Sequence, residues 1–504
     1  MLLLIPQIAL ASSYVAGPLV RVSGASPFAD SNCGLAGQTG TNYPNSEVEP
    51  WVDVNPADHD NLIGAWQQDR WSNGGSRGLV VGASFNGGDT WTVVDRTKNT
   101  RCTGGTRANG GNYDRASDPW VTISPNGNAY LMSLSIDDNP NSVFGSNPDA
   151  MLVSRSTDGG RTWSAPTTLI RDTNLNRLND KNSMTADPNS SKYVYAIWDR
   201  LVTPPSGTPN PVPGENSFAY RGPTLFARTT DGGARWENAR IIYDPGTQNQ
   251  TIGNQIVVLP DNQKFDGELV DVFDLIYNTK NAHKHRGLNA ALIRSKDHGR
   301  TWSQSPIVFA KLLPTDVTDP DNGNPVRSAD GIPDVAVDPH SGQLYAVWED
   351  SRFSGGQYNG IALSTSTDGG LTWSDPVKVN KTPTNIPAAD RQAFVPSVDV
   401  AGDGTVSVTY YDFRNNTSEP KALTDYWAIH CHPSANNRCS HSGNYGAERR
   451  LTNTSFDLEQ APVARGYFMG DYQGLANMGP DFGSFFSQTQ GPGPTNIFFR
   501  SYGP

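Results

Sequence analysis

The chain has 504 residues, including 50 glycines, 37 prolines, 12 tryptophans, 18 tyrosines and 18 phenylalanines. This composition predicts many short strands joined by turns. The formal net charge of −11 at pH 7 argues against a nucleic-acid partner, because phosphate binding needs a basic surface. An anionic small ligand stays compatible with this charge, since a few arginines can make one pocket locally positive.

The N-terminal stretch "MLLLIPQIALASS" is apolar and ends near an Ala-Leu-Ala sequence, so it resembles a signal peptide. We place that signal at residues 1–17 and the mature domain at residues 18–504. No later stretch approaches the ~20 apolar residues that a membrane span needs. Four cysteines allow three pairings, of which Cys33–Cys102 and Cys431–Cys439 are favoured as local clamps. None of them has zinc-site spacing, so we predict no metal and no cofactor, in a secreted, extracellular protein.

Along the chain, a motif of Ser or Thr, Asp, Gly and Trp recurs at residues 84–91, 156–163, 229–236, 295–302 and 366–373. Two strand-like segments precede each copy, such as "EPWVDVNP" and "LIGAWQQDR" before the first. One strand leads into the motif and one leaves it. A repeat of about 70 residues with four strands per repeat indicates a β-propeller.

Six such repeats lie between about Asn45 and Ser455, and the tail adds three more strand-like runs. The segment "PLVRVSG" at Pro18–Gly24 supplies a fourth strand from the other end of the chain. We therefore predict an all-β fold, a single β-propeller with seven blades favoured and six as the alternative, closed by pairing of the N- and C-terminal strands. Closure removes exposed strand edges, which favours a monomer.

The repeated motif is interpreted as structural. Its Asp and Ser/Thr side chains can accept backbone N–H bonds within a turn, its glycines permit positive φ, and its Trp packs between sheets. The first copy has Asn86 where the others have Asp, which fits this role because an amide oxygen accepts the same bonds.

Polar residues gather at the opposite ends of the strands, where each first strand begins and each second strand ends. This rim set comprises Glu47, Glu49, Asp69, Arg70, Arg115, Asp118, Asp137, Asp138, Asp180, Lys181, Asp199, Arg200, Asn254, Gln255, Arg327, Asp330, Asp350, Arg352, Arg391, Gln392, Asp412, Arg414, Asp471 and Tyr472. One interpretation is that Asp–Arg pairs brace neighbouring blades. The other is that arginines bind a carboxylate while Asp and Glu supply acid and base for glycosidic cleavage.

The loop at Thr315–Pro325 contains Asp316, Asp319 and Asp321. These carboxylates are candidates for calcium, but they lack the ordered spacing of a known calcium loop. We interpret the loop as a solvated turn.

The segments "EVEPWVDVNP", "ASDPW", "DGGRTW", "YYDFRNN" and "GDYQGLA" resemble the sialidase superfamily of Asp-box, or BNR-repeat, proteins, in particular secreted exo-alpha-sialidase-like members. The resemblance covers nearly the whole chain as a repeat pattern. It implies an arginine triad that binds the substrate carboxylate, a nucleophilic Tyr paired with Glu, and an Asp as acid/base.

Transferred to this chain, the resemblance makes Tyr472 the nucleophile with Glu47 or Glu49 as its partner, and Asp69 or Asp118 the acid. The expected substrate-binding residues are Arg70, Arg115, Arg352, Arg391, Arg414 and Asp471. The favoured function is a sialidase-like exo-glycosidase that acts on terminal acidic sugars of glycans. The alternatives are a lyase for uronic-acid-containing glycans and a non-catalytic carbohydrate-binding or interaction propeller.

Overall fold

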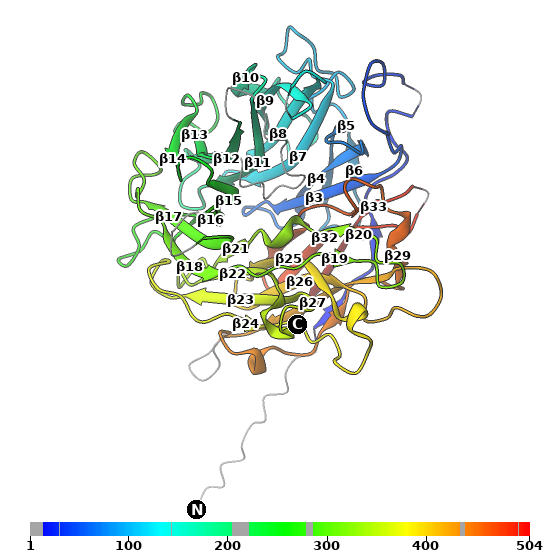
Figure 1. The fold of residues 1–504 in the computed structure, drawn as a ribbon. Coiled ribbons are helices and arrows are strands. Elements are labelled where there is room, and N and C mark those ends of the chain that lie inside the picture. Colours follow the sequence, from blue (N-terminus) through cyan, green and yellow to red (C-terminus); the bar gives the residue numbers. More distant parts are fainter. Residues whose placement is uncertain are drawn as a thin grey trace, which may run out of the picture.

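Antiparallel strands that follow one another in the chain make up nearly all of the regular secondary structure (Figure 1). The computed structural model describes residues 14–29, 31–142, 144–203, 221–278, 286–433, 439–491 and 493–504. The all-β class expected from the sequence is confirmed. The few helical segments are single 3-10 turns: η1 (Ala329–Gly331), η2 (Ser351–Ser354), η3 (Ala388–Arg391), η4 (Ser442–Asn444) and η5 (Leu458–Gln460).

Residues 47–311 form four units of four strands. The first unit is β3 (Glu47–Val54), β4 (Asn61–Arg70), β5 (Ser76–Phe85) and β6 (Thr92–Val94). The second is β7 (Arg115–Ile123), β8 (Ala129–Asp138), β9 (Ser146–Ser156) and β10 (Thr167–Asp172), joined to the first by the single residue pair Ser76–Ala116. The third is β11 (Arg177–Ala186), β12 (Val194–Val202), β13 (Thr224–Thr229) and β14 (Arg240–Tyr243). The fourth is β15 (Gln250–Val258), β16 (Leu269–Ile276), β17 (Asn289–Ser295) and β18 (Ile307–Lys311).

Three further units and one small sheet follow. The fifth unit is β21 (Asp334–Val337), β22 (Leu344–Asp350), β23 (Gly360–Ser366) and β24 (Val377–Lys378). The sixth is β25 (Ala393–Val400), β26 (Val406–Asp412), β27 (Leu423–Cys431) and β28 (Arg449–Arg450), with β29 (Phe456–Asp457) also on β27. The last unit is β31 (Gly474–Met478), β32 (Asp481–Gln488) and β33 (Asn496–Gly503). The small sheet is β19 (Val317–Thr318), β20 (Pro325–Arg327) and β30 (Tyr467–Phe468).

Both ends of the chain meet in the last unit. The N-terminal strands β1 (Val15–Ala16) and β2 (Val20–Arg21) pair with β33. The folded part thus includes Val15 and Ala16, ahead of the boundary at Pro18 drawn from the sequence. The rest of the expected signal segment, residues 1–13, lies outside the described residues.

The first strand of each unit, called here an inner strand, lies toward the middle of the molecule (Figure 1). Each inner strand contacts the next in the order β3, β7, β11, β15, β21, β25, β31, and β31 contacts β3. Side chains also accept or donate hydrogen bonds between neighbouring inner strands. These bonds join Asp53 to Ile123, Thr122 to Ala186, Thr185 to Ile256, Gln255 to Val335, Asp334 to Val398 and Asp399 to Asn477, over 2.6–3.2 Å.

Apolar side chains fill the space between neighbouring units. Trp198 of the third unit, for example, is fully buried against residues of the second, including Met132 and Met151. The last unit packs on the first in the same way, where Phe485 and Phe499 meet Leu62. Burial of these large side chains stabilises the arrangement of the units, because each fully buried apolar side chain contributes about 1.5–3 kcal/mol.

The five repeated turns have the local bonding expected of them. In one copy the Thr162 N–H donates to Asp158 Oδ1 (2.9 Å) and the Gly160 N–H to Ser156 Oγ (3.0 Å). The first copy has the same bond from the Thr90 N–H to Asn86 Oδ1 (3.0 Å). These turns lie near the ends of the inner strands, since Asn61 at the start of β4 donates to the Gly159 carbonyl (3.2 Å).

Two disulfides, Cys33–Cys102 and Cys431–Cys439, fix surface loops, and the described residues contain no free cysteine. Within the part of the chain that the structure describes, no helix is long and apolar enough to cross a membrane.

Candidate active site

Bulges at the beginnings of the inner strands direct polar side chains toward the centre. The pairing register shifts near the start of β3, β7, β11, β15 and β25. At each shift one residue has positive φ: Glu49 (52°), Asp118 (52°), Lys181 (43°), Gly253 (67°) and Val395 (49°). Positive φ is uncommon outside glycine, and such residues cluster at functional sites. The bulges therefore mark this end of the inner strands as the candidate site, opposite the repeated turns.

Asp471 lies between two cations in this site. The Lys181 ammonium and the Arg327 guanidinium both donate to its carboxylate, with Arg327 Nε at 2.9 Å from Oδ1. The side chains of Lys181 and Asp471 are 7% and 1% exposed. Burial alone would raise the pKa of Asp471, but Arg327 and Lys181 hold it well below its usual range. Asp471 is therefore a buried anion.

Glu49 is the opposite case. Its carboxyl group is buried, accepts a bond from the Gln67 amide and lies 3.5 Å from the Asp471 N–H. Burial, together with the negative charges of Asp118 and Asp471, raises its pKa to about 8. A carboxyl group with a pKa near neutrality can serve as acid or base, because both forms are populated at working pH.

Several buried polar atoms of the site have no hydrogen-bond partner. Ser117 donates to Asp118 Oδ1 (2.6 Å), but Asp118 Oδ2 is unpaired. The amide oxygens of Asn182 and Asn254 and the Nε of Arg70 are unpaired as well. Buried polar groups are normally satisfied, so such atoms indicate a place for water or a ligand.

Arg70 is the arginine best placed to meet an anion. It is 3% exposed, its Nη1 donates to Gln67 Oε1 (2.9 Å), and its guanidinium lies 4.9 Å from the Phe468 ring. Burial lowers its pKa to about 10, while Glu49 acts in the other direction. Among the described residues, no carboxylate forms an ion pair with Arg70.

Tyr472 packs beside this cluster. Its ring meets Trp51 and Trp120 edge-on, with centroids 5.8 and 5.4 Å away, and its hydroxyl donates to the Pro119 carbonyl (3.0 Å). Burial raises its pKa well above 10, and the negative charges of Glu49, Asp118 and Asp471 raise it further. In this state the phenol is protonated and hydrogen-bonded to the backbone.

Two cavities lie between the inner strands. One is near the beginnings of these strands and is called the upper cavity, and the other is along their later halves and is called the lower cavity. The upper one, of about 40 Å³, is lined by Lys181, Asn182, Asn254, Asp471 and Tyr472, among others. The lower one, of about 400 Å³, is lined by the later halves of the inner strands and shares Trp120, Gln255 and Asp334 with the upper one. Of the charged residues, Lys181, Asp334 and Asp471 line the upper cavity, whereas Glu49, Asp118 and Arg70 do not, and the cavity has room for only a few water molecules.

The structure places three other predicted residues outside this cluster, in bracing roles. Asp69 accepts from Ser26 (2.8 Å), the Asn45 N–H (2.9 Å) and Arg77 (3.2 Å), so its carboxylate is fully engaged. Glu47 accepts from Gln68 (2.6 Å) and Ser23 (3.2 Å). Arg115 donates to Gln38, Asn73, Gly74, Thr39 and Asp138 (2.7–3.0 Å).

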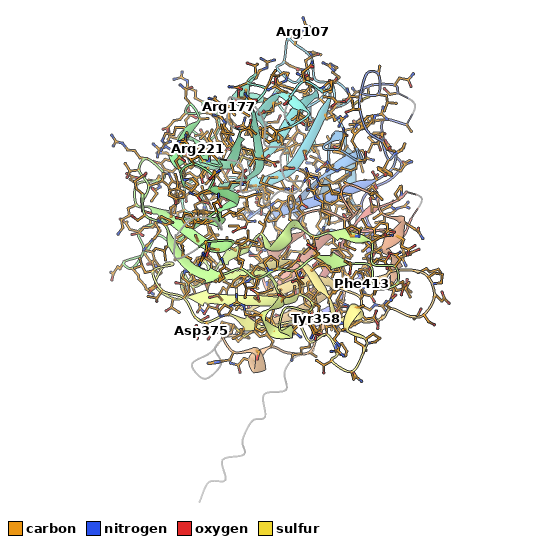
Figure 2. All side chains as sticks on the ribbon, in the orientation of Figure 1. Arg107, Arg177, Arg221, Tyr358, Asp375 and Phe413 are labelled. Atoms are coloured by element: carbon orange, nitrogen blue, oxygen red, sulfur yellow. A yellow bond between two sulfur atoms is a disulfide. The ribbon has the colours of Figure 1, made fainter. Side chains whose placement is uncertain are left out.

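The expected grouping of Arg352, Arg391 and Arg414 with Arg70 is not what the structure has. Arg352 binds Asp350 through Nε (2.8 Å) and Nη2 (2.7 Å), and Arg414 binds Asp412 (2.6 Å) and Glu448. Arg391 donates to the Ile386 carbonyl (2.8 Å) of its own loop and overlies Tyr358, which lies in the lower part of the view in Figure 2. Arg352 and Arg414 thus form Asp–Arg pairs with the aspartates at the ends of β22 and β26, of the kind expected from the sequence in the bracing interpretation.

Lys181 and Arg327, which were expected only as rim residues, and Asn182, which was not predicted, are part of the cluster. Their signal was weak, because a Lys–Asn pair or a lone Arg before a strand matches no motif. No group of three or more His, Cys, Asp or Glu side chains able to hold a metal ion occurs in the described segments.

The chain matches no protein-family model. It is similar to a sialidase from Micromonospora viridifaciens, with 24% identity over 270 residues, which cover 52% of this chain and 36% of that protein. The match thus spans about a third of the length of that relative. It confirms the resemblance to the sialidase superfamily noted from the sequence.

Among solved structures, a Hadza microbial sialidase is similar over 89% of this chain and 74% of its own, with 17% identity and a TM-score of 0.46. A leech intramolecular trans-sialidase covers 97% of this chain and 98% of its own, with 12% identity and a TM-score of 0.44. An α-L-arabinofuranosidase from Fusarium graminearum covers 72% and 88%, with 13% identity and a TM-score of 0.43.

Proposed function

We propose that the seven units are the blades of one closed propeller, and that the chain is a secreted, sialidase-like glycoside hydrolase whose active site is the cluster at the start of the inner strands. The continuous order of inner-strand contacts, from β3 through β31 and back to β3, supports the blade number. The sequence match to a sialidase supports the class of reaction.

The single observation that carries the proposal is the grouping of Glu49, Asp118, Tyr472 and Arg70 around unpaired polar atoms. Tyr472 and Glu49 are the nucleophile and its partner expected from the resemblance, and they are electrostatically coupled. Glu49, with a pKa of about 8, takes the phenolic proton when it is ionised. The Tyr472 oxygen, released from the Pro119 carbonyl, then attacks the anomeric carbon while the glycosidic C–O bond breaks. Water later hydrolyses the glycosyl–Tyr472 bond, and the proton held by Glu49 returns to the phenol.

The other groups have complementary roles in this proposal. Asp118 donates a proton to the leaving-group oxygen as the glycosidic bond breaks, through Oδ2, the one unpaired carboxyl oxygen among the four grouped residues. Arg70 binds the carboxylate of an acidic sugar through its unpaired Nε side. The Lys181–Asp471–Arg327 group fixes the segments that surround the site.

The size of the upper cavity favours a second candidate function. Ligand pockets usually have about 300–1,000 Å³, whereas this cavity has about 40 Å³. A sugar ring enters only if the covering loops move and Tyr472 leaves Pro119. If they do not move, the polar cluster is internal bracing and the chain is a non-catalytic carbohydrate-binding or interaction propeller.

Two measurements separate these functions. One is the hydrolysis of a panel of fluorogenic glycosides that includes a sialoside and an α-L-arabinofuranoside, and the other is binding to a glycan array. The proposal predicts release from the sialoside, and a drop in kcat/KM of at least about 100-fold in Arg70→Met, as expected for loss of a charged hydrogen-bond partner. Arg391→Met, outside the cluster, is the matched control and should keep full activity.

Release from the neutral arabinofuranoside but not from the sialoside would contradict an acidic substrate, while the assignment as a glycoside hydrolase would stand. No release from any glycoside, together with binding to the glycan array, would contradict the hydrolase and support the non-catalytic carbohydrate-binding propeller.

A further inference from the structure

The amide of one buried glutamine, Gln67, contacts three polar side chains of the candidate site. Gln67 belongs to β4 and is fully buried. Its Oε1 accepts from Arg70 Nη1 (2.9 Å), and its Nε2 donates to Glu49 Oε2 and to Ser117 Oγ (3.1 Å). Ser117 Oγ in turn donates to Asp118 Oδ1 (2.6 Å). A single neutral side chain therefore links one cation of the site to two of its acids.

The position of Gln67 between two bulges explains how it reaches both acids. On β4 it pairs with Val48, next to the register shift of β3 that contains Glu49. Ser117 stands at the corresponding shift of β7, directly before Asp118. Glu49 and Asp118 both have positive φ (52° each). The Gln67 side chain thus spans from the first unit to the second at the point where both inner strands are bulged.

The chemistry of the partners fixes the direction of each hydrogen bond. A guanidinium only donates, so the Gln67 oxygen must face Arg70 and the Gln67 nitrogen must face Glu49. The Ser117 hydroxyl accepts from that nitrogen, and among the contacts of the described residues its one acceptor is Asp118 Oδ1. Glu49 Oε2 and Asp118 Oδ1 are thereby committed as acceptors. When either acid is protonated, its proton is therefore held on the other oxygen.

We propose that Gln67 is a positioning residue, whose directed hydrogen bonds orient the two carboxyl groups and the guanidinium that it links. This inference rests on the proposed function for the roles of those groups. The arrangement leaves the proton of Asp118 on Oδ2, the oxygen that serves the leaving group in the proposed reaction. It also supplies a donor to Glu49, which stabilises the ionised form that accepts the phenolic proton of Tyr472.

Gln67 also separates the Arg70 cation from the Glu49 carboxyl group. Its amide is hydrogen-bonded to both, and Arg70 forms no ion pair with a carboxylate in the part of the chain that the structure describes. Direct pairing with Glu49 would occupy donors that the proposed function assigns to the carboxylate of the substrate. The neutral amide therefore keeps the guanidinium available.

The test is the titration of Glu49 itself, in the whole chain labelled with ¹³C at the side-chain carboxyl carbon of glutamate. The NMR signal of Glu49 is the one that Glu49→Gln removes. Burial raises the pKa of this group to about 8. The titratable and charged groups that face it are Asp118, Asp471, Lys181, Arg70 and Tyr472.

Gln67→Met should raise the midpoint of the Glu49 titration by at least about one pH unit, because a hydrogen bond to the charged form is lost. Methionine fills a similar volume, so Arg70 stays apart from Glu49. Gln67→Glu guards against a failure to fold, since its carboxylate still accepts from Arg70. It places a second carboxyl group against Glu49, so the midpoint should rise in this variant as well.

Gln68→Met is the matched control. Gln68 is the next residue and is also buried (2% exposed), but its amide donates to Glu47, which lies outside the cluster (2.6 Å). This variant removes a buried amide of the same type from the same strand. It should leave the Glu49 titration unchanged.

Activity is a second readout, which separates this inference from the proposed function. On a sialoside, Gln67→Met should lower kcat/KM by about 10- to 100-fold, and the ascending limb of its pH profile should move to higher pH. Ser117→Ala should lower kcat/KM without changing the Glu49 titration, because it breaks only the branch to Asp118. Ser117→Thr, which keeps the hydroxyl, should restore the activity.

An unchanged Glu49 midpoint in either Gln67→Met or Gln67→Glu would overturn this inference, even if the wild type hydrolyses the sialoside. A wild type that hydrolyses no glycoside, with a Glu49 midpoint that rises in both variants, would support the directed hydrogen bonds and contradict the proposed function instead.

Discussion

Lys181 and Asp471 are 290 residues apart in the sequence and form a buried ion pair at the centre of the molecule. Lys181 belongs to β11, and Asp471 precedes β31 of the last unit. The pair therefore joins two units that are not neighbours in the order of inner strands. Arg327 binds the same carboxylate from the small sheet, so one anion fixes three separate segments.

Removing this anion should destabilise the protein strongly. Asp471→Asn would leave the buried Lys181 and Arg327 without their shared partner, and breaking a buried pair in this way costs about 3–5 kcal/mol. Lys181→Met should cost less, because Asp471 keeps Arg327. Urea unfolding of the two variants measures the free energies. Equal, small losses in both would show that the ion pair contributes little.

The buried carboxyl group of Asp334, which lines the lower cavity, predicts that stability depends on pH. Burial raises the pKa of Asp334 to about 7, although bonds from the Val398 and Val335 N–H groups oppose the shift. The folded state then binds a proton that the unfolded state has released, so the contribution of Asp334 to stability is greatest at low pH and falls as pH rises from about 4 to about 7. The slope for one group reaches about 1.4 kcal/mol per pH unit.

Asp334→Asn should flatten that slope, since the amide oxygen still accepts from Val398 but does not titrate. The free energy of unfolding at pH 4, 5.5 and 7 measures the effect. Asp375→Asn is the control, because Asp375 is exposed at the outer edge of the molecule (Figure 2). A pH slope that is unchanged in Asp334→Asn would contradict the assignment.

The repeated turns should matter for stability and not for catalysis. Asp158 accepts from the Thr162 N–H and from the Ser156 and Thr162 hydroxyls (2.6–2.9 Å). Asp158→Ala removes these bonds and should lower stability by about 1–2 kcal/mol. Asp158→Asn should be nearly neutral, because Asn86 makes the equivalent bonds in the first copy. Any activity found should have the same kcat/KM in both variants.

The raised pKa of Glu49 predicts the pH profile of the proposed reaction. As the base for Tyr472, Glu49 works when ionised, so kcat/KM should rise with pH along a limb with an apparent pKa of about 8. Glu49→Gln should remove the limb and lower kcat/KM by about 10²–10⁴-fold. A profile that falls through pH 8 would instead make Glu49 the acid.

The features of the fold that could be predicted from the sequence are those that depend on local, repeated interactions. The spacing of the five turns and the strand patterns between them gave the all-β repeat, because turn bonding and period-2 burial are written in neighbouring residues. The pairing of β1 and β2 with β33 followed from counting strands. Glu49, Asp118, Arg70, Asp471 and Tyr472 entered the rim set, and the structure brings them together.

The partners of each rim residue were less predictable. Asp69 and Arg115 occupy rim positions like those of Glu49 and Asp118, yet N-terminal loop residues such as Ser26 and Gln38 engage them. Those loops are specific to one unit and carry no repeat signal. The positive φ of Lys181 likewise depends on a bulge, which residue types alone do not specify.

The most direct test of the account is kcat/KM for a fluorogenic sialoside with wild-type protein, Tyr472→Phe and Arg391→Ala, each checked for an unchanged Tm. We expect turnover by the wild type and full activity in Arg391→Ala. Tyr472→Phe lacks the nucleophilic hydroxyl, so its kcat/KM should fall by at least about 10²-fold. Equal activity of Tyr472→Phe and wild type would place the chemistry outside this cluster and contradict the account.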